Sequence, residues 1–120
     1  MPEENEQISE DCVFCKILNG EIESNLVYSD EEIVAFNDIN PKAPIHILIV
    51  PRKHIESVAE MERGDEFIVG NMIKVAKILA EENRIGEKGY KLLINVGEEG
   101  GQVVPHLHLH LLGGKKLREF

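Results

Sequence analysis

The chain has 120 residues, a length that fits one domain and is too short for an eight-fold barrel enzyme. Its 13 Lys and Arg residues stand against 22 Asp and Glu residues, and the resulting net charge of -9 argues against partners such as nucleic acid or an anionic membrane. The opening MPEENEQISEDC is unlike a signal peptide and no apolar run reaches the length of a membrane span, so we expect a cytoplasmic protein.

The N-terminal region predicts a polar tail followed by a short helix. Residues 1–11 hold five acidic side chains and one aliphatic side chain, so we predict a disordered acidic tail there. A single domain is then predicted over residues 12–120. Within it, Val13–Leu18 suits a short helix, and the Asn19-Gly20 pair that follows suits its left-handed C-terminal cap.

Three strand candidates come next in the chain. LVYS and IVAFND are separated by a polar turn and predict a hairpin. Two prolines then precede IHILIVP, residues 45–51. The dense β-branched side chains of this segment predict a buried strand.

One long helix and two further strands complete the predicted fold. Apolar residues recur at intervals of four, three and four and predict a long helix: Ile68, Met72, Val75 and Leu79. Gly86, beyond the last of them, is the predicted C-terminal stop of this helix. YKLLINV and PHLHLHLL are strand candidates joined by the glycine-rich GEEGGQ. We therefore predict an α+β domain, with about five strands in an antiparallel meander and with the long and the short helix on one face.

Three of the five histidines of the chain alternate within PHLHLHLLGG. In a strand, His106, His108 and His110 face one way and the intervening leucines face the other way. Three interpretations are open: buried histidines bonded to neighbours, ligands of one metal ion, or a nucleophile flanked by groups that orient it and manage its protons. Alternate residues are about 6.6 Å apart at Cα, so a flat row of three imidazoles is an awkward metal site.

The HxHxHLL motif followed by Gly-Gly, with the upstream NDINPKAPIHILIVPRKHI and the intervening INVGEEGGQ, resembles the histidine triad (HIT) superfamily, and within it the Hint-like branch of nucleoside phosphoramidate hydrolases. The resemblance extends over nearly all of the chain from Cys12 to Gly114. It implies an enzyme that hydrolyses purine nucleoside phosphoramidates, such as an AMP-amine conjugate, to the nucleoside monophosphate without a metal in the chemistry. His108 would attack the α-phosphate and carry the nucleotidyl group as a covalent intermediate.

The resemblance also implies the other residues of the site. His110 would bind phosphate oxygens and help to transfer a proton to the leaving amine, and His46 would support that proton path. Asp38 would accept hydrogen bonds from the ribose hydroxyls and Ile39 would lie against the base. The implied nucleotide-binding positions are, besides His108 and His110, these six: Asp38, Ile39, Asn95, Gly101, Gln102 and Val103. At the position of Val103 the Hint-like branch often has a serine, so the leaving-group preference is open.

The two cysteines of the chain, Cys12 and Cys15, form a CxxC pair. On the residues alone, this pair is a metal half-site, a redox pair or two small buried hydrophobic side chains. The resemblance implies that His54 and His106 complete a site for a structural zinc ion, as in many bacterial relatives. Four protein ligands leave no position for a reactive water, so such a zinc ion would stabilise the fold only.

Two alternatives to the phosphoramidase stay open: a dinucleoside polyphosphate hydrolase, and a nucleotide-binding interaction module with negligible turnover. The resemblance and the unpaired edges of an open sheet also predict a homodimer. The long helix, Asp65 to Asn83, and the strand from Tyr90 to Val96 would pack against their symmetry mates. Phe67, Ile73 and Ile78 widen the apolar surface of that helix, although a helix buried in the core of a monomer would have the same pattern.

Overall fold

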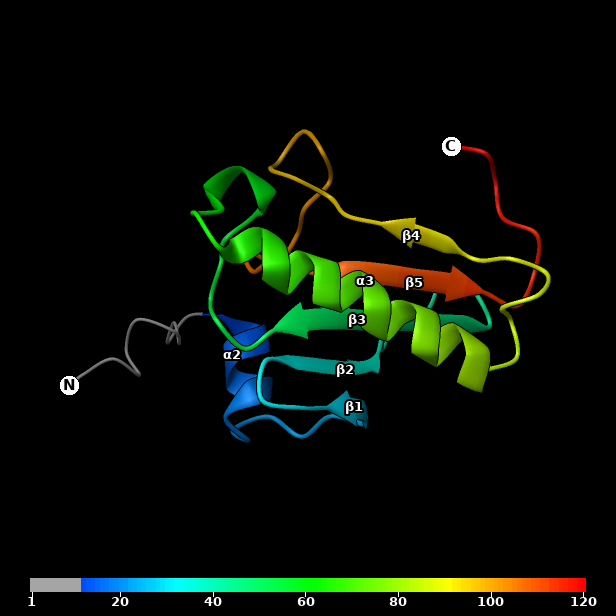
Figure 1. The fold of residues 1–120 in the computed structure, drawn as a ribbon, viewed down its shortest axis with the longest axis horizontal. Helices are drawn as coiled ribbons and strands as arrows, with labels where there is room; N and C mark the ends of the chain where they lie inside the picture. Colours follow the sequence, from blue (N-terminus) through cyan, green and yellow to red (C-terminus); the bar gives the residue numbers. More distant parts are fainter. Residues whose placement is uncertain (1–11) are drawn as a thin grey trace.

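The strands and helices of the chain are those of an α+β fold. The computed structural model describes residues 12–120, and the tail predicted over residues 1–11 lies outside the described residues. One sheet contains β1 (Leu26–Ser29), β2 (Ile33–Asn37), β3 (Ile45–Pro51), β4 (Lys91–Leu93) and β5 (Leu109–Gly113) (Figure 1). The helices are α2 (Val13–Leu18), the 3-10 helix η1 (Val58–Glu60) and α3 (Asp65–Glu82). The predicted fold class, with five antiparallel strands and a short and a long helix, is confirmed.

The strand order is β1-β2-β3-β5-β4, and every neighbouring pair is antiparallel. The predicted meander therefore holds from β1 to β3, whereas β5 lies between β3 and β4. The reason is that α3 connects β3 to β4. After such a helical crossover β4 returns parallel to β3, and the crossover leaves room for one more strand between them. β5 fills that position, pairing from Ile45 opposite Gly113 to Ile49 opposite Leu109.

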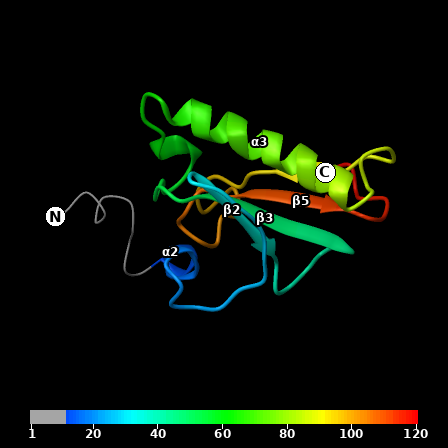
Figure 2. The same ribbon diagram turned by 60° about the horizontal axis from the view of Figure 1, so that its bottom comes forward.

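The two helices lie on opposite faces of the sheet, so the prediction that both cover one face is wrong (Figure 2). α3 packs over a core that includes Ile33, Ala35, Ile47 and Ile49. On the other face α2 packs against a second core that includes Val34, Phe36, Leu48 and Val50. Because side chains alternate along a strand, β2 and β3 supply both cores, and their continuous apolar sequence gave no sign of which face α2 would cover.

The C-terminal end of α3 differs from the sequence prediction. The helix is capped at Asn83, and Arg84 takes the left-handed conformation with a φ of 62°, so Gly86 is not the stop. The N–H of Ile85 donates to the oxygen of Ala80 at 3.0 Å, which is the hydrogen bond expected of a Schellman cap. This turn brings Ile85 back on to the core, where it is buried, and leaves the Arg84 side chain exposed.

Candidate active site and metal centre

A pocket of about 580 Å³ opens on the α2 side of the sheet. Its walls come from α2, β2 and β3 with the loop between them, the loop between β4 and β5, and β5. The lining includes most of the residues predicted for catalysis and nucleotide binding: Asp38, Ile39, His46, Asn95, Gly101, Val103, His108 and His110. Of the predicted set, only Gln102 is not part of this lining.

Alternation along the triad segment brings its histidines to the pocket. The core under α3 contains the alternate leucines: Leu107, Leu109 and Leu111. The intervening histidines therefore face the α2 side of the sheet. Regular strand begins only at Leu109, later than predicted, because the N–H of Leu107 donates to the oxygen of Ile55 at 2.6 Å instead of pairing with β3.

The ring of His108 is held in one tautomer. Its Nδ1 lies 2.7 Å from the backbone oxygen of His106, and because a carbonyl oxygen can only accept, Nδ1 carries the proton. The lone pair is then on Nε2. Burial lowers the pKa of His108, and Phe14 packs edge-on against the ring with the centroids 5.1 Å apart. His108 is therefore neutral at neutral pH, with an unprotonated nitrogen that can act as a nucleophile.

His46 and His110 form a hydrogen-bonded pair with a defined direction. The backbone N–H of Lys42 donates to Nδ1 of His46 at 3.0 Å, so the neutral ring of His46 carries its proton on Nε2. This Nε2 lies 3.0 Å from Nδ1 of His110 and donates to it. The proton of neutral His110 is then on its own Nε2. Neutral His110 therefore offers an N–H donor at its Nε2, and His108 offers a lone pair at its own Nε2. The pocket thus contains one nitrogen that can act as a nucleophile and one that can donate a hydrogen bond.

Burial lowers the pKa of His110 to about 4, and the nearby rings of His108 and His46 add to this effect. Asp38 acts in the opposite direction on both His46 and His110, and its Oδ2 lies 3.5 Å from Nε2 of His46. Ligand-type atoms of Asp38, His46 and His110 lie within 4.8 Å of one another. Nδ1 of His46 already accepts a hydrogen bond from the N–H of Lys42, so the only proton of the neutral ring is on Nε2. A metal ion on Nε2 would have to displace that proton. This group therefore suits proton transfer better than metal binding.

The side chain of Gln102 stabilises the glycine-rich loop by hydrogen bonds to backbone groups. Its Oε1 accepts from the N–H of Gly97 at 2.9 Å, and its Nε2 donates to the backbone oxygens of Glu56 at 2.8 Å and Val104 at 2.9 Å. The carboxamide is thus engaged at both ends with backbone. Gln102 connects the β4–β5 loop to the segment after β3 through Glu56, and with its carboxamide engaged in this way it does not line the pocket.

The rim of the pocket combines a tight loop with exposed apolar side chains. Asn95 donates to the oxygen of Gly100 at 2.8 Å, and Gly101 has a φ of 86°, a conformation that side chains other than glycine rarely adopt. Ile39 and Val103 are 89% and 88% exposed. Large apolar side chains that stand free at the mouth of a pocket indicate contact with a ligand.

Sequence reasoning missed the apolar end of the pocket. Side chains there come from α2 and its following turn, from β2 and from β3: Phe14, Ile17, Ile22, Phe36 and Leu48. The rings of Phe14 and Phe36 meet edge to face with centroids 5.5 Å apart. In the sequence these residues look like ordinary core positions, because their role depends on α2 covering the same face as the triad.

A second cluster lies beside the triad and contains all four predicted metal ligands: Cys12, Cys15, His54 and His106. Nδ1 of His106 is 3.3 Å from Sγ of Cys12 and 3.5 Å from Sγ of Cys15, and Nδ1 of His54 is 3.3 Å from Sγ of Cys15. The two Nδ1 atoms are 3.2 Å apart. Tetrahedral zinc bonds of about 2.0 to 2.3 Å place neighbouring N and S ligands about 3.3 to 3.6 Å apart, so the spacing fits such an ion.

The protonation of this Cys/His cluster also fits a metal ion. Nε2 of His106 lies 2.9 Å from the backbone oxygen of Pro51 and must donate to it, so the lone pair of Nδ1 points into the cluster. Cys12 and Cys15 are buried and not joined by a disulfide. Burial lowers the pKa of His106 to about 4, which keeps the ring unprotonated and able to ligate. The four side chains therefore form a potential metal site.

Comparisons with known proteins agree with this geometry. The HIT domain family matches residues 19–117 of the chain. The purine nucleoside phosphoramidase of Escherichia coli (strain K12) is 46% identical over 110 residues, which cover 92% of this chain and 92% of that protein. An uncharacterised HIT-like protein of Buchnera aphidicola subsp. Baizongia pistaciae (strain Bp) is 49% identical over 107 residues, or 89% of this chain and 96% of that one.

Solved structures resemble the fold over the same length. A histidine triad protein from Clostridium difficile superposes with a TM-score of 0.90 at 46% identity, covering 93% of this chain and 97% of that chain. A HIT family hydrolase from Legionella pneumophila superposes with a TM-score of 0.88 at 45% identity, covering 91% of this chain and 97% of that chain.

Proposed function

This chain belongs to the HIT domain family, and from that premise we propose that it hydrolyses purine nucleoside phosphoramidates, such as an AMP-amine conjugate, to the nucleoside monophosphate and a free amine. The observation that carries the proposal is the state of His108. Its Nδ1–H is bound to the oxygen of His106, which leaves Nε2 as a nucleophile in the same pocket as the donor of His110. The relative from Escherichia coli, named a purine nucleoside phosphoramidase, supports the substrate class.

The proposed chemistry has two steps. Nε2 of His108 attacks the α-phosphorus and forms a nitrogen–phosphorus bond, the bond to the leaving amine breaks, and the amine takes a proton from Nε2 of His110. Water then attacks the phosphorus, the bond to His108 breaks, and a proton from the water returns to His110. Because the pKa of His110 is about 4 in the free protein, the anionic phosphate and Asp38 must favour its protonation within the complex. In the free protein His46 orients His110 through its Nε2. When His110 takes up the proton, its Nδ1 also becomes a donor, and Nε2 of His46 can then donate to Oδ2 of Asp38, which lies 3.5 Å away.

The nucleoside would occupy the apolar half of the pocket. Oδ1 of Asp38 accepts from the N–H of Asn40 at 2.8 Å, which fixes the carboxylate where it can accept from the ribose hydroxyls. The base would lie between Ile39 and the aromatic pair of Phe14 and Phe36. This pocket favours a flat, largely apolar base and supports the nucleotide as substrate.

The phosphate would meet the glycine-rich loop. Asn95, Gly101 and Val103 line the pocket next to the triad, and we propose that they contact the phosphate or the leaving group. Gln102 would act by fixing the loop, since its carboxamide is engaged with Gly97 and with two other backbone groups. Val103 puts an apolar surface where the leaving amine departs.

We propose that the Cys/His cluster holds one structural zinc ion and that no metal takes part in the chemistry. The donor set of two thiolates and two imidazoles is typical of structural zinc sites. Such an ion would join the start of α2, which carries Cys12 and Cys15, to the segment of the catalytic histidine. Its contribution would be to the stability of the fold.

A homodimer and a cytoplasmic location complete the proposal. On α3 the side chains of Phe67 and Ile73 are 72% and 46% exposed, and on β4, an edge strand, Leu92 and Leu93 are each 38% exposed. Pairing of two copies through α3 and β4 would cover these side chains and satisfy the unpaired backbone groups of the edge strand.

Cysteines kept reduced as metal ligands suit the cytoplasm. No helix among residues 12–120 is long and apolar enough to cross a membrane.

Incubation with an AMP-amine conjugate and, separately, with a dinucleoside polyphosphate tests the function. Wild type should release AMP from the conjugate and become transiently labelled from a substrate with radioactive α-phosphorus. His108→Ala should lose the label and on the order of a thousandfold or more of the activity, whereas Lys74→Ala, on the exposed face of α3, should keep both. Unchanged labelling of His108→Ala contradicts the mechanism. Faster cleavage of the dinucleoside polyphosphate, or nucleotide binding without turnover, would favour one of the two alternatives instead.

A further inference from the structure

The segment that follows β3 contacts the candidate site through its backbone. The oxygen of Ile55 accepts from the N–H of Leu107 at 2.6 Å, and the oxygen of Glu56 accepts from Nε2 of Gln102 at 2.8 Å. The residue before Ile55 is a member of the Cys/His cluster. We refer to residues 53–56 as the support segment. At successive positions it contacts the metal cluster, the triad segment and the glycine-rich loop.

The peptide group between His106 and Leu107 links the support segment to His108. Its N–H donates to the oxygen of Ile55 at 2.6 Å, and its C=O accepts from Nδ1 of His108 at 2.7 Å. Because a peptide group is planar, the direction of its N–H fixes the direction of its C=O. Each of the two hydrogen bonds also polarises the peptide group in favour of the other. The ring of His108 is therefore aligned by Ile55 through this one peptide group.

An ion pair joins the support segment to α3. Nζ of Lys53 donates to Oδ1 of Asp65 at 2.8 Å, and Oδ2 of the same carboxylate accepts from the backbone N–H of Glu62 at 2.8 Å. The side chain of Asp65 is only 4% exposed. Among residues 12–120, Lys53 is the only cation within 4.0 Å of this carboxylate. Asp65 is thus a buried anchor for the ammonium group of Lys53.

The start of α3 does not need this cation. Asp65 is the first residue of α3, and the N-terminal end of a helix stabilises a negative charge by itself. A lysine at the same end opposes the helix dipole. The helix therefore gains little from Lys53, and the pair instead holds the support segment. α3 is a firm anchor for that segment because its apolar side packs on the core of the sheet.

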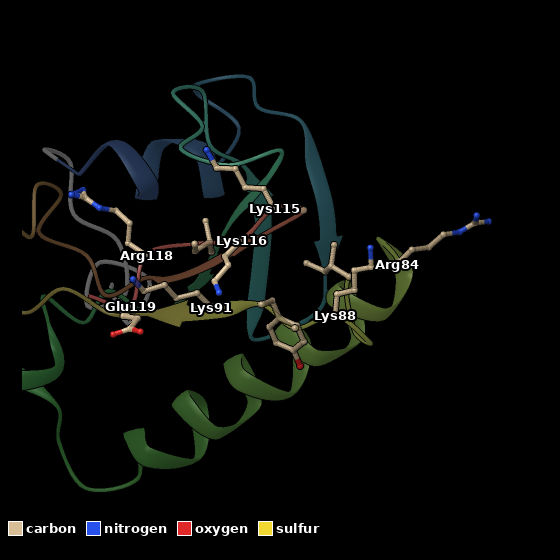
Figure 3. A pocket seen from close by; sticks show the side chains of 12 residues that line it. Arg84, Lys88, Lys91, Lys115, Lys116, Arg118 and Glu119 are labelled. Atoms are coloured by element: carbon tan, nitrogen blue, oxygen red, sulfur yellow. The ribbon is translucent and has the colours of Figure 1, made fainter.

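The ion pair is separate from both cavities beside which α3 and β5 lie. A cavity of about 1000 Å³ lies at the C-terminal end of α3, beside β4, and its lining includes Arg84 and Lys91 (Figure 3). That is the edge where the second copy of the proposed dimer would pair. Asp65 is at the opposite end of the 18-residue helix, and Lys53 lines neither this cavity nor the triad pocket. A change at Lys53 therefore touches neither that edge nor a bound substrate.

We propose that Lys53 is a positioning residue of the hydrolysis, which holds the support segment so that the ring of His108 keeps its orientation. The pair with Asp65 fixes the segment, the oxygen of Ile55 fixes the peptide group, and the peptide group fixes the ring. The effect on catalysis rests on the proposed function, whereas the hydrogen bonds belong to the free protein. Misplacement of a reacting group by about 1 Å can lower a rate on the order of a hundredfold.

Kinetics with an AMP-amine conjugate test the proposal. Lys53→Met keeps an unbranched apolar chain and removes the ammonium group, so it should lower kcat about tenfold or more and change KM less than about threefold. Lys53→Arg keeps a cation that can reach the carboxylate and should recover most of kcat. Arg52→Met is the matched control, because the Arg52 side chain donates to the oxygen of Asp30 and to Ser29 instead of to α3. It should change kcat less than about twofold.

Hydrogen exchange of the Leu107 amide tests the support without a substrate. Its N–H is bonded to Ile55, so exchange should be about tenfold or more faster in Lys53→Met and near the wild-type rate in Lys53→Arg and Arg52→Met. A wild type that does not hydrolyse the conjugate contradicts the proposed function, and the exchange rates still decide whether Lys53 holds the segment. If Lys53→Met does not fold, Asp65→Asn, which keeps an acceptor oxygen, replaces it with the same expected directions.

Four results would overturn the proposal. One is wild-type kcat or wild-type Leu107 exchange in Lys53→Met, since the pair would then hold nothing that the site needs. Another is an equal loss in Lys53→Met and Arg52→Met, which would indicate a general effect of charge or stability. A rise in KM with kcat unchanged would indicate a role in substrate binding instead. A loss of bound metal confined to Lys53→Met, by elemental analysis, would assign the effect to the Cys/His cluster and not to Ile55.

Discussion

Lowering the pH from about 8 to about 5 should reduce the free energy of unfolding by about 2 kcal/mol less in His110→Asn than in wild type. Burial lowers the pKa of this histidine from 6.5 to about 4, with the rings of His108 and His46 adding to the shift. Between these two pH values the unfolded chain binds a proton at this position and the folded protein does not. Acid therefore stabilises the unfolded state, and the free energy of unfolding falls as the pH falls from about 6.5 to about 4.

The magnitude follows from the two pKa values. Near pH 5 the unfolded ring gains about 2 kcal/mol from protonation, and the folded ring, with its pKa of about 4, gains less than about 0.1 kcal/mol. Above about pH 7.5 neither state is protonated and the contribution is fully present. The ring of His110 is only partly buried, so the measured difference should be 2 kcal/mol or slightly less.

Urea denaturation of the metal-free protein near pH 8 and near pH 5 measures this effect. The loss of unfolding free energy between the two pH values should be smaller in His110→Asn than in wild type by about 2 kcal/mol. Lys74→Gln, which changes an exposed residue of α3, should keep the dependence of the wild type. Equal pH dependence in wild type and His110→Asn would refute the reasoning, because it would mean that the folded protein protonates His110 as easily as the unfolded chain.

Further predictions concern the metal, the assembly and a glycine of the triad motif. Protein purified without chelator should contain one zinc ion per chain by elemental analysis, and Cys12→Ala/Cys15→Ala should contain none; a wild type without zinc contradicts the proposal. Light scattering at micromolar concentration should give twice 13.5 kDa, and Ile73→Glu should shift the mass towards 13.5 kDa; a wild type at 13.5 kDa contradicts the dimer. Gly113→Ala should cost about 1 to 3 kcal/mol in urea denaturation, because its new Cβ would lie 2.5 Å from Cδ1 of Ile85. Ile85→Val, which removes that methyl group, should recover part of the loss in the double variant, and simple addition of the two losses would contradict this contact.

Periodicity was enough to predict the elements that matter most for the site. The alternation of His106, His108 and His110 with leucines predicted that the histidines share one face of the strand and the leucines the other, and the leucines do lie in the core under α3. The four candidate metal ligands, 94 residues apart at the extremes, do meet in one cluster. Periodicity therefore predicted which face the histidines share, whereas the set of metal ligands and the other pocket residues came from the resemblance to the HIT superfamily.

The remaining errors concern arrangements that a pattern of two or of 3.6 residues does not contain. The side of the sheet that α2 covers depends on packing against β2 and β3, which are apolar on both faces. The position of β5 between β3 and β4 follows from the crossover through α3. The tautomer of His46 is determined by the backbone N–H of Lys42, a group that every residue other than proline has and that no sequence motif marks.

His106 belongs to both sites at once, and this links the potential metal site to His108, the proposed nucleophile. Its side chain lies in the Cys/His cluster, with Nδ1 towards the cysteines and Nε2 bound to the oxygen of Pro51, while its backbone oxygen accepts from Nδ1 of His108. The ring orientation of the proposed nucleophile therefore depends on where the backbone of His106 lies. A metal ion in the cluster would hold the ring of His106 at Nδ1, and Pro51 of β3 holds it at Nε2, so both would restrict the position of the residue. Such an ion would act on the chemistry only by position, through a single carbonyl oxygen, without contact with the substrate.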